Sequence, residues 1–115
     1  MTKELGLYGE DLALSELKKK GYLILDRNFK CKIGEIDIIA RDKNHLVFIE
    51  VRSKTDASSG LPQETVNNTK KRKIRRVAEY YLLKNNLLEE YCRFDVVGIV
   101  WTGINPEICI IQDAF

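Results

Sequence analysis

Residues 34–54, GEIDIIARDKNHLVFIEVRSK, contain two runs of alternating side chains separated by Lys43 and Asn44. Alternation with a period of two predicts β-strands, and a two-residue connection predicts that they pair as an antiparallel hairpin. In the first run Ile36 and Ile38 fall on one face, and apolar residues also occupy the other face. Because strands that are apolar on both faces are usually covered on both sides, we expect a sheet between layers of helices.

The predicted hairpin register opposes charged side chains. With a two-residue loop, Asp37 faces Glu50 and Glu35 faces Arg52. Two carboxylates about 5 Å apart repel by roughly 3 kcal/mol at an effective dielectric constant of about 20. A cation between Asp37 and Glu50 would relieve this repulsion. The candidates are Arg52, Lys54 and a bound divalent metal ion.

The remaining segments predict further helices and strands. In chain order we expect a helix at 3–22, strands at 22–30, 33–42 and 45–54, a loop at 55–65 that is mobile, a helix at 69–86 with Thr69 as its N-cap, and strands at 92–101 and 107–112. The second helix would carry the chain across so that the strand at 92–101 runs parallel to the one at 45–54. We therefore predict one α/β domain spanning residues 1–115, with a central mixed five-stranded sheet flanked by helices in the order αβββαββ.

The helix at 69–86 combines an apolar stripe with a basic block. Its apolar residues recur at helical spacing, at Ile74, Val77, Ala78, Tyr81 and Leu82. The basic block consists of Lys70, Lys71, Arg72, Lys73, Arg75 and Arg76. These six charges exceed the net charge of +2, so the rest of the chain sums to −4. The block is either a nucleic-acid contact surface or a solvated helix face.

Composition excludes several classes of protein. The chain has 115 residues, of which 44% are hydrophobic, enough for a single core without disulfides. The longest nearly uncharged apolar run, at 96–101, is too short for a membrane span, and the N-terminal segment lacks the apolar core of a secretory signal. Cys31, Cys92 and Cys109 form no CxxC pair, so we expect buried free thiols and a cytoplasmic protein without a membrane partner.

A third acid lies on the first predicted helix. Glu10 shares a stripe with Ala13, Leu14 and Leu17, which is an unusual position for an acid that only aids solubility. Carboxylates from two strands and one helix suit Mg²⁺ or Mn²⁺, which prefer hard oxygen ligands. Such an ion can activate a water and neutralise charge on a phosphodiester. Zinc is not expected, because the only histidine, His45, lies in the hairpin turn.

These residues also carry a resemblance. GEIDIIARD followed by FIEVRSK, with YGEDLAL upstream and the Lys-rich helix downstream, resembles the YraN-like family of small bacterial proteins of unassigned function. That family is similar to the PD-(D/E)XK nuclease superfamily, and most of all to the archaeal Holliday-junction resolvases. The resemblance covers the chain from about Gly9 to Ile111 and implies a restriction-endonuclease-like fold.

The resemblance implies roles for several residues. Asp37 matches the first metal-binding acid and Glu50 the second, while Val51 would offer its backbone carbonyl to the metal. Glu10 matches the acid that the resolvases carry on a helix. Glu35 belongs to the family signature without an assigned role. The implied cofactor is Mg²⁺ or Mn²⁺.

At one position the chain departs from the nuclease motif. Arg52 stands where the superfamily has lysine. Arginine can stabilise a phosphate, but it cannot release a proton at a working pH. Lys54, which is predicted to lie one repeat further along the same face, is a candidate to substitute in part for that lysine.

Two functions from different classes follow from this sequence. The first is a metal-dependent nuclease that acts on structured or branched DNA, with the basic block contacting the phosphate backbone. The alternative is a module of the same fold that has lost most or all cleavage and binds nucleic acid or a protein partner. A scaffold that contacts no nucleic acid is a third reading. Since resolvases that cut two strands symmetrically act as dimers, the analogy also suggests a homodimer.

Overall fold

A computed structural model of the chain describes residues 3–54, 61–101 and 103–115, with side chains from Tyr8 onward. In chain order its elements are α1 (Lys3–Lys19), β1 (Leu23–Lys30), β2 (Glu35–Asp42), β3 (His45–Lys54), the 3₁₀ helix η1 (Pro62–Thr65), α2 (Asn68–Lys84), β4 (Tyr91–Val100) and β5 (Glu107–Ile111). The predicted order αβββαββ is confirmed, with η1 as an addition. Of the loop predicted to be mobile, residues 55–60 lie outside the described residues, and Pro62 in η1 is buried.

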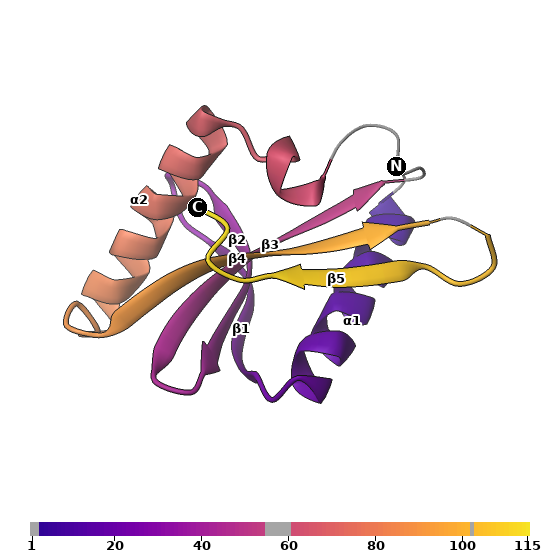
Figure 1. The fold of residues 1–115 in the computed structure, drawn as a ribbon. Helices are drawn as coiled ribbons and strands as arrows, with labels where there is room; N and C mark the ends of the chain where they lie inside the picture. Colours follow the sequence, from indigo (N-terminus) through magenta and orange to yellow (C-terminus); the bar gives the residue numbers. More distant parts are fainter. Residues whose placement is uncertain (1–2, 55–60, 102) are drawn as a thin grey trace.

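The five strands form one sheet in the order β1-β2-β3-β4-β5 (Figure 1). Strands β3 and β4 are parallel, and the other neighbours are antiparallel, which confirms the mixed sheet. In the β2–β3 hairpin, Asp42 pairs with His45 and Ile38 with Ile49. This is the register that the two-residue loop predicts.

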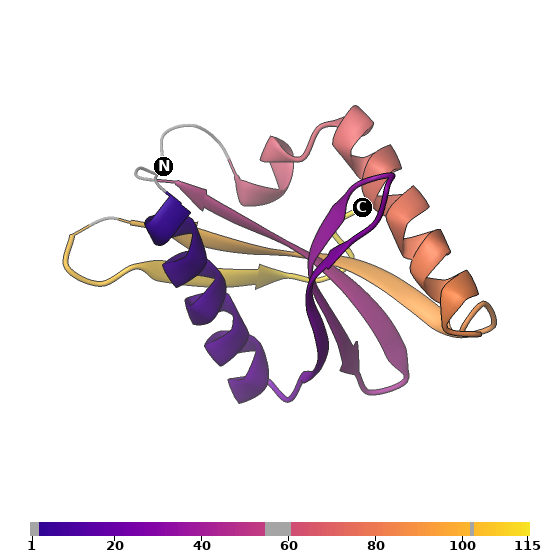
Figure 2. The same ribbon diagram turned by 180° about the vertical axis from the view of Figure 1, so that it is seen from behind.

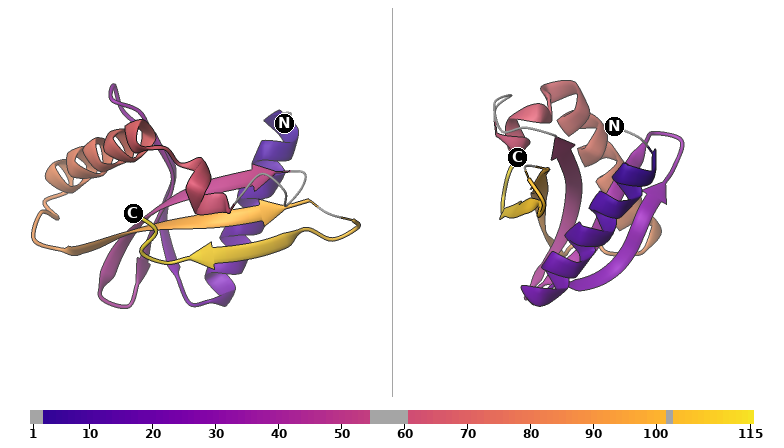
Figure 3. Two further views of the ribbon diagram at one scale, coloured as in Figure 1. Left: turned by 45° about the horizontal axis from the view of Figure 1, so that its top comes forward. Right: turned by 90° about the vertical axis from the view of Figure 1, so that its right-hand side faces the viewer.

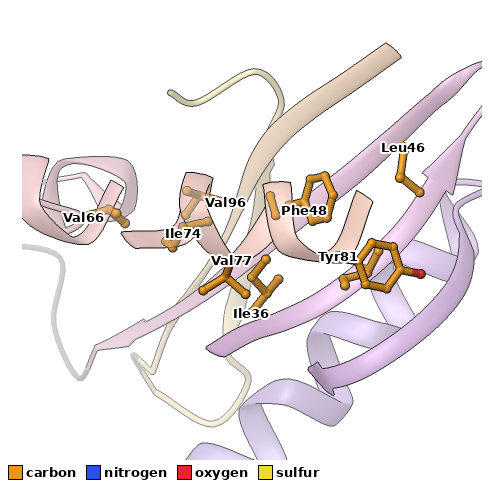
Figure 4. Close-up of a cluster of buried hydrophobic side chains, with 10 residues drawn as sticks. Ile36, Leu46, Phe48, Val66, Ile74, Val77, Tyr81 and Val96 are labelled. Atoms are coloured by element: carbon orange, nitrogen blue, oxygen red, sulfur yellow. The ribbon is translucent and has the colours of Figure 1, made fainter. Parts of the chain in front are cut away.

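The two long helices cover opposite faces of the sheet (Figures 2 and 3). On one face, Ala13 and Leu17 of α1 pack against Ile38, Val47 and other residues of the sheet. On the other face, α2 buries its predicted apolar positions in a separate cluster, whose members include Ile74, Val77, Ala78, Tyr81, Ile36 and Phe48 (Figure 4). The expectation of a sheet between helical layers is therefore confirmed.

Helix α2 begins at a different cap from the one predicted. The side chain of Asn67 accepts a hydrogen bond of 2.8 Å from the backbone N–H of Lys70, so Asn67 is the N-cap and Thr69 lies inside the helix. The segment offers Asn67, Asn68 and Thr69 in succession. Asparagine is the better cap of the two residue types, and its use places Lys70 in the first turn.

Strand β2 does not alternate along its whole length. Ile36 belongs to the cluster under α2 and Ile38 to the cluster under α1, so the prediction that they share a face is wrong. The ladder with β3 ends at the Ile38–Ile49 pair, whereas pairing with β1 continues to Glu35. The β1–β2 hairpin therefore bends away from β3, and Asp37 lies at the bend.

Two further expectations concern cysteines and membranes. All three cysteines are free, but none is buried as predicted: Cys31 and Cys92 are half-buried, and Cys109, on the edge strand β5, is exposed. Among the residues that the structure describes, no helix has the length and apolarity that a bilayer crossing requires.

Candidate metal and phosphate site

Asp37 and Glu50 line the same cavity. It has a volume of about 240 Å³ and lies between the bent end of β2, the middle of β3 and the first turns of α2; its other lining residues are Gly34, Glu35, Lys70, Lys73, Ile74 and Val77. The structure thus brings together the two acids that the hairpin register predicts. Glu35 does not face Arg52 as predicted, since the hairpin bends away and Glu35 pairs with Lys30 at 3.5 Å.

The bend fixes the carboxylate of Asp37. Its Oδ2 accepts a hydrogen bond of 2.8 Å from the backbone N–H of Val51, just beyond the end of the ladder. Burial, and then the negative charge of Glu50, raise the pKa of Asp37 to about 7, although the Val51 hydrogen bond and Lys70 act in the opposite direction. A pKa this high means that the ionised form of Asp37 is disfavoured in the folded protein. A further cation beside the carboxylate would therefore be stabilising.

Glu50 is buried and paired with two cations. Its side chain is 6% exposed, and its Oε1 lies 2.8 Å from Nζ of Lys70 and 3.8 Å from Nη1 of Arg52. A buried carboxylate needs such partners to offset the loss of hydration. The lysine that contacts the acidic pair is therefore Lys70 of α2, a residue that the sequence assigned only to the basic block.

Arg52 is tied to the segment that leads into α2. Its Nε donates to Oγ1 of Thr65 at 2.8 Å and its Nη2 to the carbonyl of Thr65 at 3.4 Å. Lys54 lines a different hollow, together with Arg52, Pro62 and Thr65. The cavity with the two acids is thus bordered by Lys70, and Lys54 is not among its lining residues.

Glu10 approaches the pair from the α1 side of the sheet. Its Oε1 lies 3.6 Å from Nε of Arg27, and both atoms are buried without a hydrogen-bond partner. Glu10 is close enough for its charge to contribute to the raised pKa of Asp37. Over the described part of the chain, no three His, Cys, Asp or Glu side chains form a group able to hold a metal, so Asp37 and Glu50 stand as a pair with Glu10 further away.

Comparison with known proteins gives the family. The model of "Uncharacterised protein family UPF0102" matches residues 9–99. This chain belongs to family UPF0102. UPF0102 proteins of Clostridium kluyveri and Clostridium acetobutylicum are each 44% identical to it, over 99% and 100% of this chain and 95% and 96% of theirs. A UPF0102 protein of Clostridium botulinum is 43% identical over 99% of this chain and 95% of its own.

The matched region of the UPF0102 chain contains every side chain of the site. Glu10, Asp37, Glu50, Arg52 and Lys70 all lie within residues 9–99. The resemblance to a family of small bacterial proteins is therefore confirmed at the level of UPF0102.

The basic block of the UPF0102 chain divides into separate groups. Lys70 contacts Glu50, whereas Arg75 lies over the rings of Phe94 and Phe115 and Lys71 over that of Phe115. Lys73 lines the cavity of the acidic pair, Arg76 lines a neighbouring hollow, and Arg72 is exposed. On one side of α2, Lys71 and Arg75 pack on aromatic rings, and on another side Lys70 and Lys73 border the acidic pair.

Two contacts of the site had no local signal in the sequence: that of Lys70, named only within the basic block, with Glu50, and that of Thr65 with Arg52. Lys70 and Thr65 reach β3 only because α2 crosses the face of the sheet, so the contacts depend on tertiary structure. Thr65 also donates from Oγ1 to the carbonyl of Pro62 at 2.6 Å, which fixes its hydroxyl for Arg52.

Proposed function

We propose that this UPF0102 protein is a cytoplasmic, divalent-metal-dependent nuclease that hydrolyses phosphodiester bonds in structured or branched DNA. The observation that carries the proposal is the shared cavity of Asp37 and Glu50 with Lys70 at its border. The resemblance to the PD-(D/E)XK superfamily supports the same reading, through the spacing of Asp37, Glu50 and Arg52 along two strands.

The donor groups fit a hard divalent cation. Asp37 and Glu50 would hold Mg²⁺ or Mn²⁺ together with the carbonyl of Val51, since all three supply oxygen ligands. The raised pKa of Asp37 and the buried Oε1 of Glu10, which accepts no hydrogen bond and lies 3.6 Å from Nε of Arg27, both indicate negative charge that the protein alone does not fully compensate. When bound, such an ion supplies an activated water and neutralises charge on the phosphodiester.

The protein's own cations act on the phosphate. Lys70 has a 42% exposed side chain, so its ammonium can leave Glu50 and contact a phosphate oxygen in the cavity. A lysine can also exchange a proton, which Arg52 cannot. Arg52 instead holds η1 through Thr65 and so positions the chain that enters α2. Lys70 therefore takes the place that the motif gives to lysine on β3.

A binding module without cleavage is the second candidate. It is favoured by the contacts that Lys70 and Arg52 make with Glu50, because these cations already neutralise one of the two acids. In this alternative the acidic pair maintains the fold, and the remaining basic residues bind nucleic acid.

A cleavage assay separates these candidates. Purified protein is incubated with four-way junction, flap and single-stranded DNA in Mg²⁺, in Mn²⁺ or in EDTA. The nuclease proposal predicts cleavage by the wild type only with metal, and losses on the order of 100-fold or more in Asp37→Asn and Glu50→Gln. Glu89→Gln, at an exposed acid, is the matched control and should cut normally. Binding without cleavage by any of these proteins would favour the module.

The resolvase analogy extends the proposal to a homodimer. Analytical ultracentrifugation with and without junction DNA tests this extension. A single monomer species bound to the junction under both low and high protein concentration would contradict it.

A further inference from the structure

Three hollows follow one another along the seam between α2 and the tip of the β1–β2 hairpin. The first is the cavity of the acidic pair, which Gly34 and Lys73 help to line. The second is bounded by Ile33, Arg76 and Tyr80. The third also uses Ile33 and Tyr80 and has a volume of about 520 Å³. Figures 1 and 2 both show the hairpin tip beside α2, and we call this row of three hollows the hairpin groove.

The hairpin groove is basic. Six lysines and arginines line it against four acids: the cations are Lys30, Lys32, Lys70, Lys73, Arg76 and Lys84, and the acids are Glu35, Asp37, Glu50 and Glu79. Glu35 is paired with Lys30 at 3.5 Å. Among the residues that the structure describes, no ion pair engages Lys32, Lys73 or Arg76. The groove therefore presents cations whose charge is available to a polyanion.

An aromatic ring stands in the middle of the groove. Tyr80 is 42% exposed, and its ring leans on Phe29, with the two centroids 6.2 Å apart. Phe29 in turn packs edge-on against the buried Tyr81. Nζ of Lys84 lies 6.0 Å from the centroid of the Phe29 ring. Because Phe29 supports it, the Tyr80 ring is available for stacking with little loss of side-chain freedom.

We propose that the hairpin groove binds single-stranded nucleic acid, with its lysines and arginines contacting phosphates and Tyr80 stacking on an unpaired base. A row of cations with an interleaved aromatic ring is the arrangement that single strands prefer. A duplex keeps its base faces stacked internally, so it can use the cations but not Tyr80. The inference rests on the proposed function for one point only, namely that the groove leads the strand to the acidic pair.

The inference is tested by binding without metal, so that cleavage plays no part. Fluorescence anisotropy in EDTA compares the binding of a labelled single strand, an abasic strand of the same length and a duplex. For the wild type we expect the single strand to bind more tightly than either of the other two. Tyr80→Ala should weaken binding of the single strand roughly 5-fold to 150-fold and leave the abasic strand unaffected, while Tyr80→Phe should retain wild-type binding.

Matched variants separate the groove from general charge and surface effects. Lys32→Ala should lower the slope of log affinity against log salt by about 0.7, as expected for one lost phosphate contact with a single strand. Tyr91→Ala, at another exposed tyrosine, and Lys18→Ala, on the last turn of α1, should bind as the wild type does. Unfolding midpoints equal to that of the wild type confirm that each variant is folded.

The outcomes distinguish this inference from the nuclease proposal. Equal binding of the single strand by the wild type and Tyr80→Ala, or tighter binding of duplex than of single strand, overturns the groove even if the protein cuts DNA. Loss of binding in Tyr80→Ala and Lys32→Ala without any metal-dependent cleavage supports the groove and overturns the nuclease proposal.

Discussion

The ammonium of Lys70 lies 2.8 Å from Oε1 of Glu50, whose side chain is 6% exposed. This contact joins the first turn of α2 to the middle of β3. It neutralises a buried acid from a helix that is distant in the sequence, and it places a lysine beside the pair formed by Glu50 and Asp37. The basic start of α2 is therefore more than a solvated helix face.

Replacing Lys70 by alanine should destabilise the fold. Glu50 would keep only Arg52, at 3.8 Å, as a cationic partner. We expect the free energy of unfolding to fall by about 1–3 kcal/mol, below the range for fully buried pairs because the lysine is partly exposed. Urea denaturation monitors the change.

The double variant Lys70→Ala/Glu50→Gln is the control for that prediction. Removing the buried charge as well should restore most of the lost stability, since no unpaired carboxylate remains. If the loss of stability in the double variant equals the sum of the losses in Lys70→Ala and Glu50→Gln, Lys70 and Glu50 do not interact.

Asp37 should make stability depend on pH. Its pKa is raised from 3.8 to about 7, so between these values the folded state binds more protons than the unfolded state. The stabilising contribution of the protonated group is complete below about pH 4 and is lost as the pH rises through about 7. Asp37→Asn can still accept the Val51 hydrogen bond, and it should be more stable than the wild type by roughly 1–2 kcal/mol at pH 8.

Thermal unfolding between pH 4 and pH 8 checks this behaviour, with Glu89→Gln as a matched acid-to-amide control. Addition of Mg²⁺ at pH 8 should raise the melting temperature of the wild type and leave that of Asp37→Asn unchanged. If Asp37→Asn is less stable than the wild type at pH 8, the ionised carboxylate stabilises the fold and Asp37 is an ordinary ion-pairing residue.

Arg52→Lys introduces the lysine that the motif of the proposed nuclease resemblance has at this position, but it should increase neither stability nor cleavage. The forked contacts of Arg52 with Thr65 cannot be made by one ammonium group. We expect a loss of about 1–2 kcal/mol in the free energy of unfolding and no gain in cleavage. Thr65→Val should produce a loss of similar size, and an increase in cleavage by Arg52→Lys would refute the role given to Lys70.

Gly98→Ala should loosen η1. A Cβ on Gly98 would overlap the ring of Pro62, and a proline ring cannot rotate away. We expect a destabilisation of about 1–3 kcal/mol together with weaker anchoring of Thr65.

Gly9→Ala, where the added Cβ meets Ile99 at an ordinary 3.4 Å, is the matched control within α1 and should be neutral or slightly stabilising. Hydrogen exchange in residues 61–66 would report the difference.

Local patterns predicted much of this fold. The β2–β3 register followed from a two-residue loop, and the burial of Ile74, Val77 and Tyr81 followed from helical spacing, because both depend on neighbouring residues alone. The break of alternation at Asp37 depends on the bend of the β1–β2 hairpin away from β3. A strict period of two assumes a regular strand and so does not predict this bend.

The candidate site was predicted in part for the same reason. Asp37 and Glu50 were expected to meet, since they lie on one hairpin. The partners Lys70 and Thr65 come from α2 and η1, and only the packing of these elements on the sheet brings them to Glu50 and Arg52. For this reason the sequence favoured Lys54 as the substitute lysine, whereas the structure places Lys70 on the acidic pair.

The central claim is that Asp37 and Glu50 bind a divalent cation. Crystals soaked in Mn²⁺ and measured by anomalous diffraction test it most directly. We predict an anomalous peak between the two carboxylates and near the carbonyl of Val51, with the ammonium of Lys70 moved away from Glu50. The absence of any peak in that cavity, with Lys70 still bound to Glu50, would contradict the claim.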